Sequence, residues 1–212
     1  WWAWLSVTYA GVPIVQSTIS PKSSSGDQWT TIGGQSLRES SPAILGLVNA
    51  WIMTRPAPLA QVIDVAATQR AADDGSGVPK LIVPPYSATG GGTLASALTT
   101  STSATNTGAV LTGSTAPQVG EYLVIEPGTT NVETIYLRSV VDNGDGTWTV
   151  KGLGTSQGLS ANFSKAHAAG VTTRTSYTTD GLHPAMAMHL LMAEPVKAAK
   201  TGAYLKSATL VP

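Results

Sequence analysis

The chain has 212 residues, a formal charge of zero from twelve basic and twelve acidic residues, and no cysteine. A neutral chain offers no electrostatic footprint for nucleic acid and no polybasic segment for a membrane surface. Without cysteine there is no disulfide framework, thiolate nucleophile or zinc–thiolate site. No apolar run reaches the ~18 residues that a membrane-spanning helix needs, and no signal peptide is visible.

Only 11% of the residues are charged, against a usual ~25%. Solubility therefore rests on Ser, Thr, Gly and Asn, a composition common among extracellular and particle-bound β-rich proteins. The sequence begins with WWAWL, which is typical of the interior of a helix. We therefore expect a fragment or a processed piece of a larger protein.

Residues 1 to about 88 follow an α/β rhythm. The apolar run VPIVQSTI (12–19) predicts a short buried strand. A helix then begins with Ser41 as its N-cap and Pro42 at its first position, and AQVIDVAA (60–67) predicts the next buried strand. A strand, a helix and a strand in this order indicate a right-handed parallel crossover.

The pattern changes after residue 88. The glycine-rich TGGGT reads as a linker, and the alternating runs that follow predict a small antiparallel β module, with DNGDGT (142–147) as a hairpin turn. In this module we expect one core face to hold four alternating side chains, Tyr122, Val124, Ile135 and Leu137.

Helical periodicity returns only at His183. We therefore predict an α/β domain made of residues 1–88 and 176–212, interrupted by an inserted β domain over residues 89–175.

The stretch SYTTDGLHPAMAMHLLMAEPV places Asp180 three residues before His183. A histidine that acts as a general base needs its far nitrogen held by a carboxylate. Gly181 permits a tight turn between the two residues, and Pro184 suits the first position of a helix. The spacing also allows a plainer interpretation, in which Asp180 caps the helix and His183 is a solvent-facing turn residue.

DGLHP, followed by an Ala/Met-rich helix, resembles the last signature block of the SGNH (GDSL-type) hydrolases. The region of the predicted strand at 12–19 resembles that family's penultimate strand and loop, and WIMTRPAPLAQVIDVAA, with Asp64, is similar to the helix and strand that follow. The resemblance implies the C-terminal half of a flavodoxin-like, three-layer α/β domain with a parallel sheet. It also implies that His183 is the catalytic base and that Asp180 orients it.

The family's nucleophilic serine lies in a Gly-Asp-Ser block, but here Gly26 and Asp27 are followed by Gln28. The blocks that carry the oxyanion donors are also absent. A His–Asp pair without a nucleophile and an oxyanion hole cannot run acyl transfer. The resemblance therefore implies that a missing N-terminal half or a sister chain supplies both.

The segment 111–173 resembles a small β module of phage tail and other surface proteins, which implies a structural or adhesive role. DNGDG lacks the closing Glu of a calcium loop. His167 has no acid nearby in the sequence and reads as structural or exposed, and His189 reads as a residue on the helix surface or against the sheet. TGGGT lacks the Lys of a phosphate-binding loop. We therefore expect no metal site and no cofactor.

Two hypotheses follow. In the first, the chain is part of a serine esterase that acts on an acylated surface glycan and is carried on a phage tail or another surface particle. In the second, it is a non-catalytic virion or adhesin component that keeps the hydrolase scaffold. Both place the protein in a virion or outside the cell, with other virion proteins and a host-surface glycan as partners.

Overall fold

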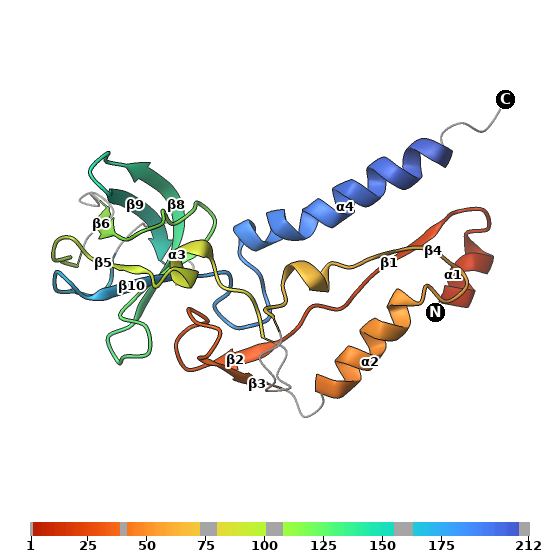
Figure 1. The fold of residues 1–212 in the computed structure, drawn as a ribbon, viewed down its shortest axis with the longest axis horizontal. Coiled ribbons are helices and arrows are strands. Elements are labelled where there is room, and N and C mark those ends of the chain that lie inside the picture. The colour runs from red at the N-terminus through yellow and green to blue at the C-terminus, as the bar shows by residue number, and fades with distance from the viewer. Residues whose placement is uncertain (1, 39–41, 73–79, 101–107, 155–162, 208–212) are drawn as a thin grey trace.

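The computed structural model describes the chain in five stretches, residues 2–38, 42–72, 80–100, 108–154 and 163–207. Figure 1 shows that the chain forms a β module at one end, from which an elongated part made of strands and helices extends. The C-terminal helix runs along this elongated part.

The elongated part consists of three helical segments and four short strands: α1 (Trp2–Thr8), β1 (Ile14–Ser17), β2 (Ser23–Ser25), β3 (Gln35–Leu37), α2 (Pro42–Met53), β4 (Leu59–Ile63) and the 3-10 turn η1 (Ala66–Thr68). β1 and β4 pair in parallel and β2 and β3 pair in antiparallel fashion. The predicted strand–helix–strand unit and its parallel pairing are confirmed. Pro42 begins the helix as predicted, whereas Ser41 lies outside the described residues.

Polar side chains fix the ends of the parallel pair. Thr18 Oγ1, just after β1, donates a hydrogen bond of 2.8 Å to Asp64 Oδ1, just after β4. The Asn49 side chain on α2 bonds both the N–H and the carbonyl of Ile19, each at 2.8 Å. The Asn49 contacts satisfy the backbone groups of Ile19 and tie α2 to the end of β1, whereas the Thr18–Asp64 bond joins the ends of the two strands.

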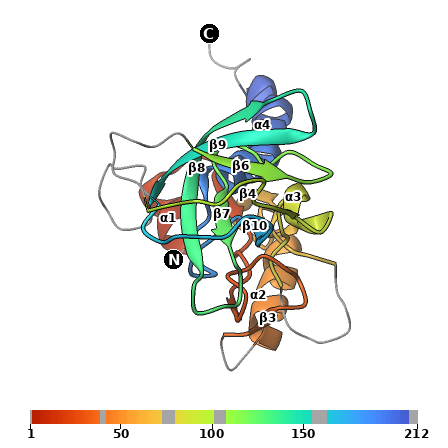
Figure 2. The same ribbon diagram turned by 90° about the vertical axis from the view of Figure 1, so that its left-hand side faces the viewer.

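The β module comprises one helical turn and six strands: α3 (Pro85–Ala88), β5 (Gly92–Thr93), β6 (Ala109–Thr112), β7 (Tyr122–Ile125), β8 (Glu133–Asp142), β9 (Thr147–Gly154) and β10 (Thr172–Ser176). They form one sheet in the order β5-β10-β7-β8-β9-β6, which faces the viewer in Figure 2. An isolated bridge between Leu94 and Leu111 brings the two edges together, so the sheet is nearly closed into a barrel. Asp142 pairs with Trp148, which confirms the DNGDGT hairpin.

The main hydrophobic core lies inside this sheet. It contains Leu123 and Ile125 from β7 and Ile135 and Leu137 from β8, each at most 2% exposed. The predicted face is therefore correct on β8 but wrong by one residue on β7, because antiparallel pairing sets Leu123 opposite Ile135. Tyr86 on α3 belongs to the same core and is fully buried.

Helix α4 (Met186–Ser207) begins two residues after Pro184 and runs through Pro195. Its first turn packs Ala187 and Met188 against Tyr177 in a second, smaller core. The predicted start at Pro184 is wrong, because Pro184 instead forms a β-bridge with Thr178. Within the described residues, no helix combines the length and apolar character needed to cross a membrane.

The predicted three-layer α/β fold with a parallel sheet is wrong. Among the described residues only β1 and β4 pair in parallel, and most strands belong to the nearly closed antiparallel sheet. The physical reason is that the strand–helix–strand unit occurs once, so it builds two parallel strands and no wider sheet.

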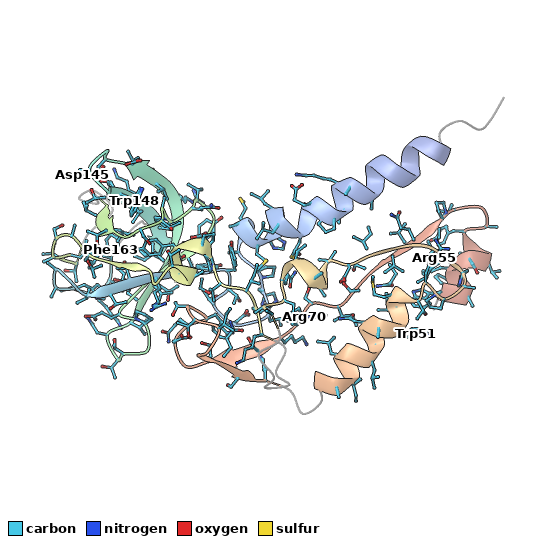
Figure 3. The ribbon with its side chains drawn as sticks, viewed as in Figure 1. Trp51, Arg55, Arg70, Asp145, Trp148 and Phe163 are labelled. Carbon is cyan, nitrogen blue, oxygen red and sulfur yellow. The ribbon has the colours of Figure 1, made fainter. Side chains whose placement is uncertain are left out.

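Figure 3 shows Trp148 and Phe163 inside the β module, whereas Trp51 lies at the far end of the elongated part.

Candidate functional site

The Asp180–His183 turn connects β10 to α4 and is held by the aspartate's own hydrogen bonds. Asp180 Oδ1 accepts the backbone N–H groups of Leu182 and His183 at 2.9 and 2.8 Å, and Oδ2 lies 2.5 Å from Nδ1 of the His183 ring. Because the carboxylate can only accept, Nδ1 carries a proton, and in the neutral ring Nε2 therefore carries the lone pair. This tautomer is the one that a general base requires.

The pair lies at the surface. The His183 side chain is 80% exposed and that of Asp180 is 41% exposed. Partial burial raises the pKa of Asp180, but the His183 backbone N–H, the His183 ring and the Leu182 N–H together outweigh it and hold the pKa well below the usual aspartate range. Asp180 is therefore a carboxylate at any pH at which the imidazole could act as a base.

Residues in and next to the β2–β3 hairpin contact the turn. The carbonyl of Asp180 accepts a hydrogen bond from Arg38 Nη1. The indole of Trp29 lies against Gly181, and its Nε1–H donates to Ser23 Oγ at 3.0 Å. The fold therefore brings the residues of this hairpin and its loop next to the predicted pair.

The pair lacks a nucleophile within the part of the chain that the structure describes. There, Asp180 is the hydrogen-bond partner of the His183 ring, and no serine or threonine hydroxyl bonds Nε2. Thr178 Oγ1 is near, but it donates to Asp180 at 3.2 Å on the other side of the pair. The arrangement can therefore orient an imidazole and accept a proton, but it cannot by itself form an acyl-enzyme.

A small apolar pocket lies beneath the turn, between Leu182, Tyr177 and Met188. Its volume of about 10 Å³ suffices for roughly one water molecule. Gln69 also lines this pocket, and its Nε2 is buried without a hydrogen-bond partner within the described stretches. Because the volume admits only about one water molecule, the pocket is too small to hold the acyl group of an ester.

The other two histidines have different environments. His189 is exposed on α4, as one of its two sequence interpretations predicted. His167 is buried, and its ring lies between Glu126 and Glu133, at 3.3 and 3.1 Å. The fold thus brings two acids to His167 that are distant in the sequence, so the expectation that it has no partner acid is wrong. Of its two predicted interpretations, structural or exposed, its burial supports the structural one. In the described part of the chain, no three His, Cys, Asp or Glu side chains gather as a metal site.

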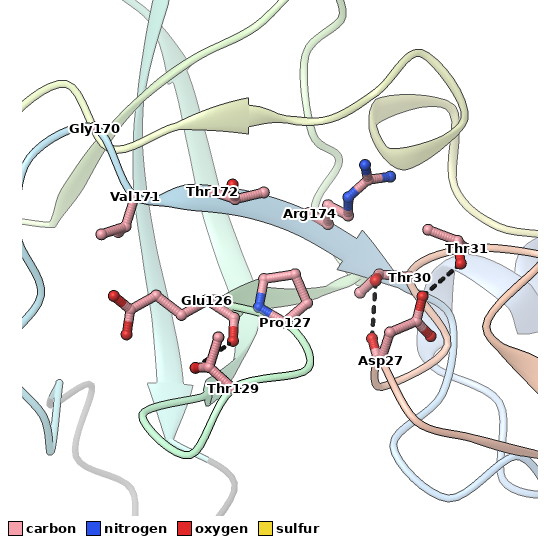
Figure 4. A pocket seen from close by; sticks show the side chains of 10 residues that line it. All are labelled: Asp27, Thr30, Thr31, Glu126, Pro127, Thr129, Gly170, Val171, Thr172 and Arg174. Carbon is pink, nitrogen blue, oxygen red and sulfur yellow. Dashed lines mark hydrogen bonds between the residues drawn. The ribbon is translucent and has the colours of Figure 1, made fainter.

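A larger pocket escaped the sequence analysis. It has a volume of about 440 Å³ and lies between the loop that connects β2 to β3, the turn after β7, and β10 (Figure 4). Its walls come from three stretches, 27–31, 126–129 and 170–174. Since these stretches are far apart in the chain, no local motif could have indicated the pocket.

Comparison of the chain with protein-family models, with curated proteins and with solved structures found no match.

Proposed function

We propose that the Asp180–His183 turn is the acid–base part of a serine ester hydrolase whose nucleophile and oxyanion donors come from polypeptide outside these 212 residues. The observation that carries the proposal is the 2.5 Å contact between Asp180 Oδ2 and His183 Nδ1, on a turn whose backbone N–H groups bond the same carboxylate. Asp180 fixes the tautomer that leaves Nε2 free to accept a proton.

In the proposed reaction, His183 Nε2 takes the proton of the serine hydroxyl as that oxygen attacks the ester carbonyl. The imidazolium then donates the proton to the departing alcohol. Water repeats the sequence and releases the acid. An acyl group on a surface glycan is the proposed ester, and a phage tail or another extracellular particle is the proposed setting.

An uncovered apolar surface supports the existence of a second polypeptide. Parallel sheets are normally covered on both faces and extend over several strands, but here the sheet has two strands. Large apolar side chains on α1, β1 and α2 are at least 40% exposed: Trp4, Val7, Val15, Ile44, Leu47 and Trp51. Ile44, Leu47 and Trp51 are spaced by three and four residues and so share one face of α2, and an exposed apolar helix face of this kind is typical of an interface. The occupant we propose is the segment that carries the serine, added as a strand to the β1–β4 pair.

The test uses the full gene product or the particle that carries the chain. Hydrolysis of 4-nitrophenyl acetate and labelling of serine by a fluorophosphonate are measured for the wild type, His183→Ala and Asp180→Asn. We expect kcat to fall about 10⁴-fold in Asp180→Asn and about 10⁶-fold in His183→Ala. His189→Ala, at another exposed histidine of the same chain, is the matched control and should be unaffected. Equal activity in the wild type and His183→Ala would refute the proposal.

The alternative function is a non-catalytic virion or adhesin component. It is favoured by the 80% exposure of the His183 side chain and by the main core, which lies in the β module rather than near the pair. The same measurements separate the two functions, because the structural alternative predicts neither hydrolysis nor serine labelling in the complete particle.

A further inference from the structure

The pocket in Figure 4 is a second candidate site, and it shares no lining residue with the Asp180–His183 turn. Its volume of about 440 Å³ is within the range of roughly 300–1,000 Å³ that is usual for small-molecule sites. One wall comes from the elongated part of the molecule and the others come from the β module. A site where two parts of a chain meet is a common location for ligand binding.

The walls of this pocket are held in place. Gly128 N–H donates to Gln28 Oε1 at 2.9 Å and so joins the β7–β8 turn to the β2–β3 loop. The Asp27 carboxylate accepts the Ser25 and Thr31 hydroxyls at 2.6 and 2.5 Å. It lies against Gly34, where a Cβ would come within 2.3 Å of Asp27 Cγ. These contacts give the pocket a defined shape before any ligand arrives.

Backbone strain is concentrated around the same pocket. Gln28, Trp29 and Glu126 all adopt left-handed backbone conformations, with φ values of 58°, 57° and 54°. Non-glycine residues rarely adopt this region, and they persist there only where the surrounding structure imposes it. Such residues cluster at binding sites. Here Glu126 lines the pocket, and Gln28 and Trp29 lie in the chain between the lining residues Asp27 and Thr30.

The lining combines hydrogen-bond acceptors and donors in fixed positions. The acceptors are the carboxylates of Asp27 and Glu126, and the Arg174 guanidinium is a planar donor. Within the described residues, Arg174 donates one N–H to the carbonyl oxygen of Ser87, at 3.3 Å. Its other N–H groups, and the exposed hydroxyl of Thr172, remain available to a ligand. Val171 and Pro127 add a small apolar surface beside these groups.

This chemistry selects the class of ligand. Two carboxylates against one guanidinium leave the lining with a net negative charge, which disfavours phosphate and carboxylate ligands. The described residues gather no three metal ligands, which disfavours a bound metal ion. A sugar ring carries hydroxyl groups that both donate and accept, and C–H faces that cover small apolar surfaces. We propose that this pocket binds a neutral saccharide of one or two rings.

The first experiment is an NMR titration of this chain alone, so that the result does not depend on the proposed hydrolysis. The probes are glucose, galactose, mannose, N-acetylglucosamine and lactose, with spermidine as a cationic probe. We expect saturable amide shifts from at least one sugar, confined to residues 27–31, 126–129 and 170–174. No shift from any sugar, or shifts from spermidine alone, would overturn the proposal while leaving the Asp180–His183 proposal untouched.

Variants then locate the binding. Thr172→Val keeps the shape and strand preference of the residue but removes its hydroxyl, and Arg174→Met keeps the stem but removes the guanidinium. Each variant should weaken binding of the responding sugar by about tenfold. Thr149→Val on β9, outside the lining, is the matched control and should bind like the wild type. If all three bind equally well, the sugar does not occupy this pocket and the proposal fails.

Discussion

The indole of Trp29 occupies the space that a side chain at Gly181 would need. A Cβ at Gly181 would lie 2.7 Å from Trp29 Cζ2 and 2.0 Å from the carbonyl oxygen of Ser23. Gly181 also has a φ of +70°, in the left-handed region. The turn that presents His183 therefore depends on a glycine for two independent reasons, its backbone conformation and the contact with the β2–β3 hairpin.

Gly181→Ala is expected to destabilise the protein and to displace the turn. The left-handed conformation costs alanine about 1 kcal/mol, and overpacking against Trp29 and Ser23 adds about 1–3 kcal/mol. Urea unfolding measures the sum. Gly144→Ala is the matched control, because Gly144 has a φ of +79° but open space around its Cα, so it should lose only about 1 kcal/mol. Equal losses in the two variants would show that Trp29 does not pack against the turn.

Asp180→Asn should release the ring of His183 without unfolding the protein. The asparagine cannot match the carboxylate that now accepts from Nδ1 at 2.5 Å, so the single tautomer should give way to a mixture. Nitrogen-15 NMR of the imidazole rings measures this change, and exposed His189 is the internal control. Unchanged ring shifts at His183 would mean that Asp180 does not fix the tautomer in solution.

The same aspartate predicts acid sensitivity of the turn. Its pKa is lowered in the folded state, so its stabilising contribution is present above the ordinary aspartate pKa and is lost as the pH falls toward the folded value. Asp180→Asn should therefore lessen the decline of stability in acid. An unchanged decline in this variant would contradict the pKa shift.

The raised pKa of Glu121 predicts the opposite effect, a stability that falls as the pH rises. The residue is fully buried just before β7, and burial raises its pKa from 4.5 to about 7, against smaller lowering by the Gln118 N–H and the Thr175 hydroxyl. Among the described atoms, Glu121 Oε1 and Thr175 Oγ1 form no hydrogen bond of good geometry, although Thr175 is close enough to affect the pKa. A proton on Glu121 would let the carboxyl donate to that hydroxyl.

Because the folded pKa of Glu121 is raised, its contribution to stability is complete below pH 4.5 and is lost as the pH rises to about 7. The shift corresponds to about 3 kcal/mol. Glu121→Gln should therefore be more stable than the wild type at pH 8 and should remove this slope. Urea unfolding at several pH values provides the measurement, and a wild-type stability that stays constant from pH 4.5 to 8 would refute the shift.

The sequence predicted features that depend on neighbours along the chain. The β1–α2–β4 unit, the DNGDGT hairpin and the contact of Asp180 with His183 all join residues that turn chemistry or periodicity places together. Where the chain fixes geometry locally, a short pattern is enough to identify it.

Features set by tertiary pairing were missed. On β7 the apolar residues are continuous, so alternation could not tell Leu123 from Val124, and only the pairing with β8 decides which side faces the core. TGGGT read as a linker, but its Gly92 belongs to β5, where a Cβ would meet Thr112 O at 1.6 Å as the two edges of the sheet approach. Neither fact is encoded in a local pattern.

The acids beside His167 are also brought there by tertiary structure and could not be predicted from a local pattern. The His167 ring lies 3.1 Å from Glu133, whose other oxygen accepts the N–H and hydroxyl of Ser164 at 2.6 and 2.7 Å. The His167 side chain is fully buried and that of Glu133 is 6% exposed, so removing the imidazole leaves Glu133 Oε2 buried without this hydrogen-bond partner. His167→Gln should therefore lose about 1–3 kcal/mol of unfolding free energy.

Glu126, the second acid beside His167, is 20% exposed and lies 3.3 Å from the ring, so Glu126→Gln should cost less, up to about 1 kcal/mol. The double variant His167→Gln/Glu133→Gln removes the buried carboxylate together with its partner and should recover part of the loss, since the effects of residues in contact are not additive. Urea unfolding of the wild type, His167→Gln, Glu133→Gln and the double variant measures the coupling. If the losses of His167→Gln and Glu133→Gln simply add, the contact between the two side chains contributes no interaction energy.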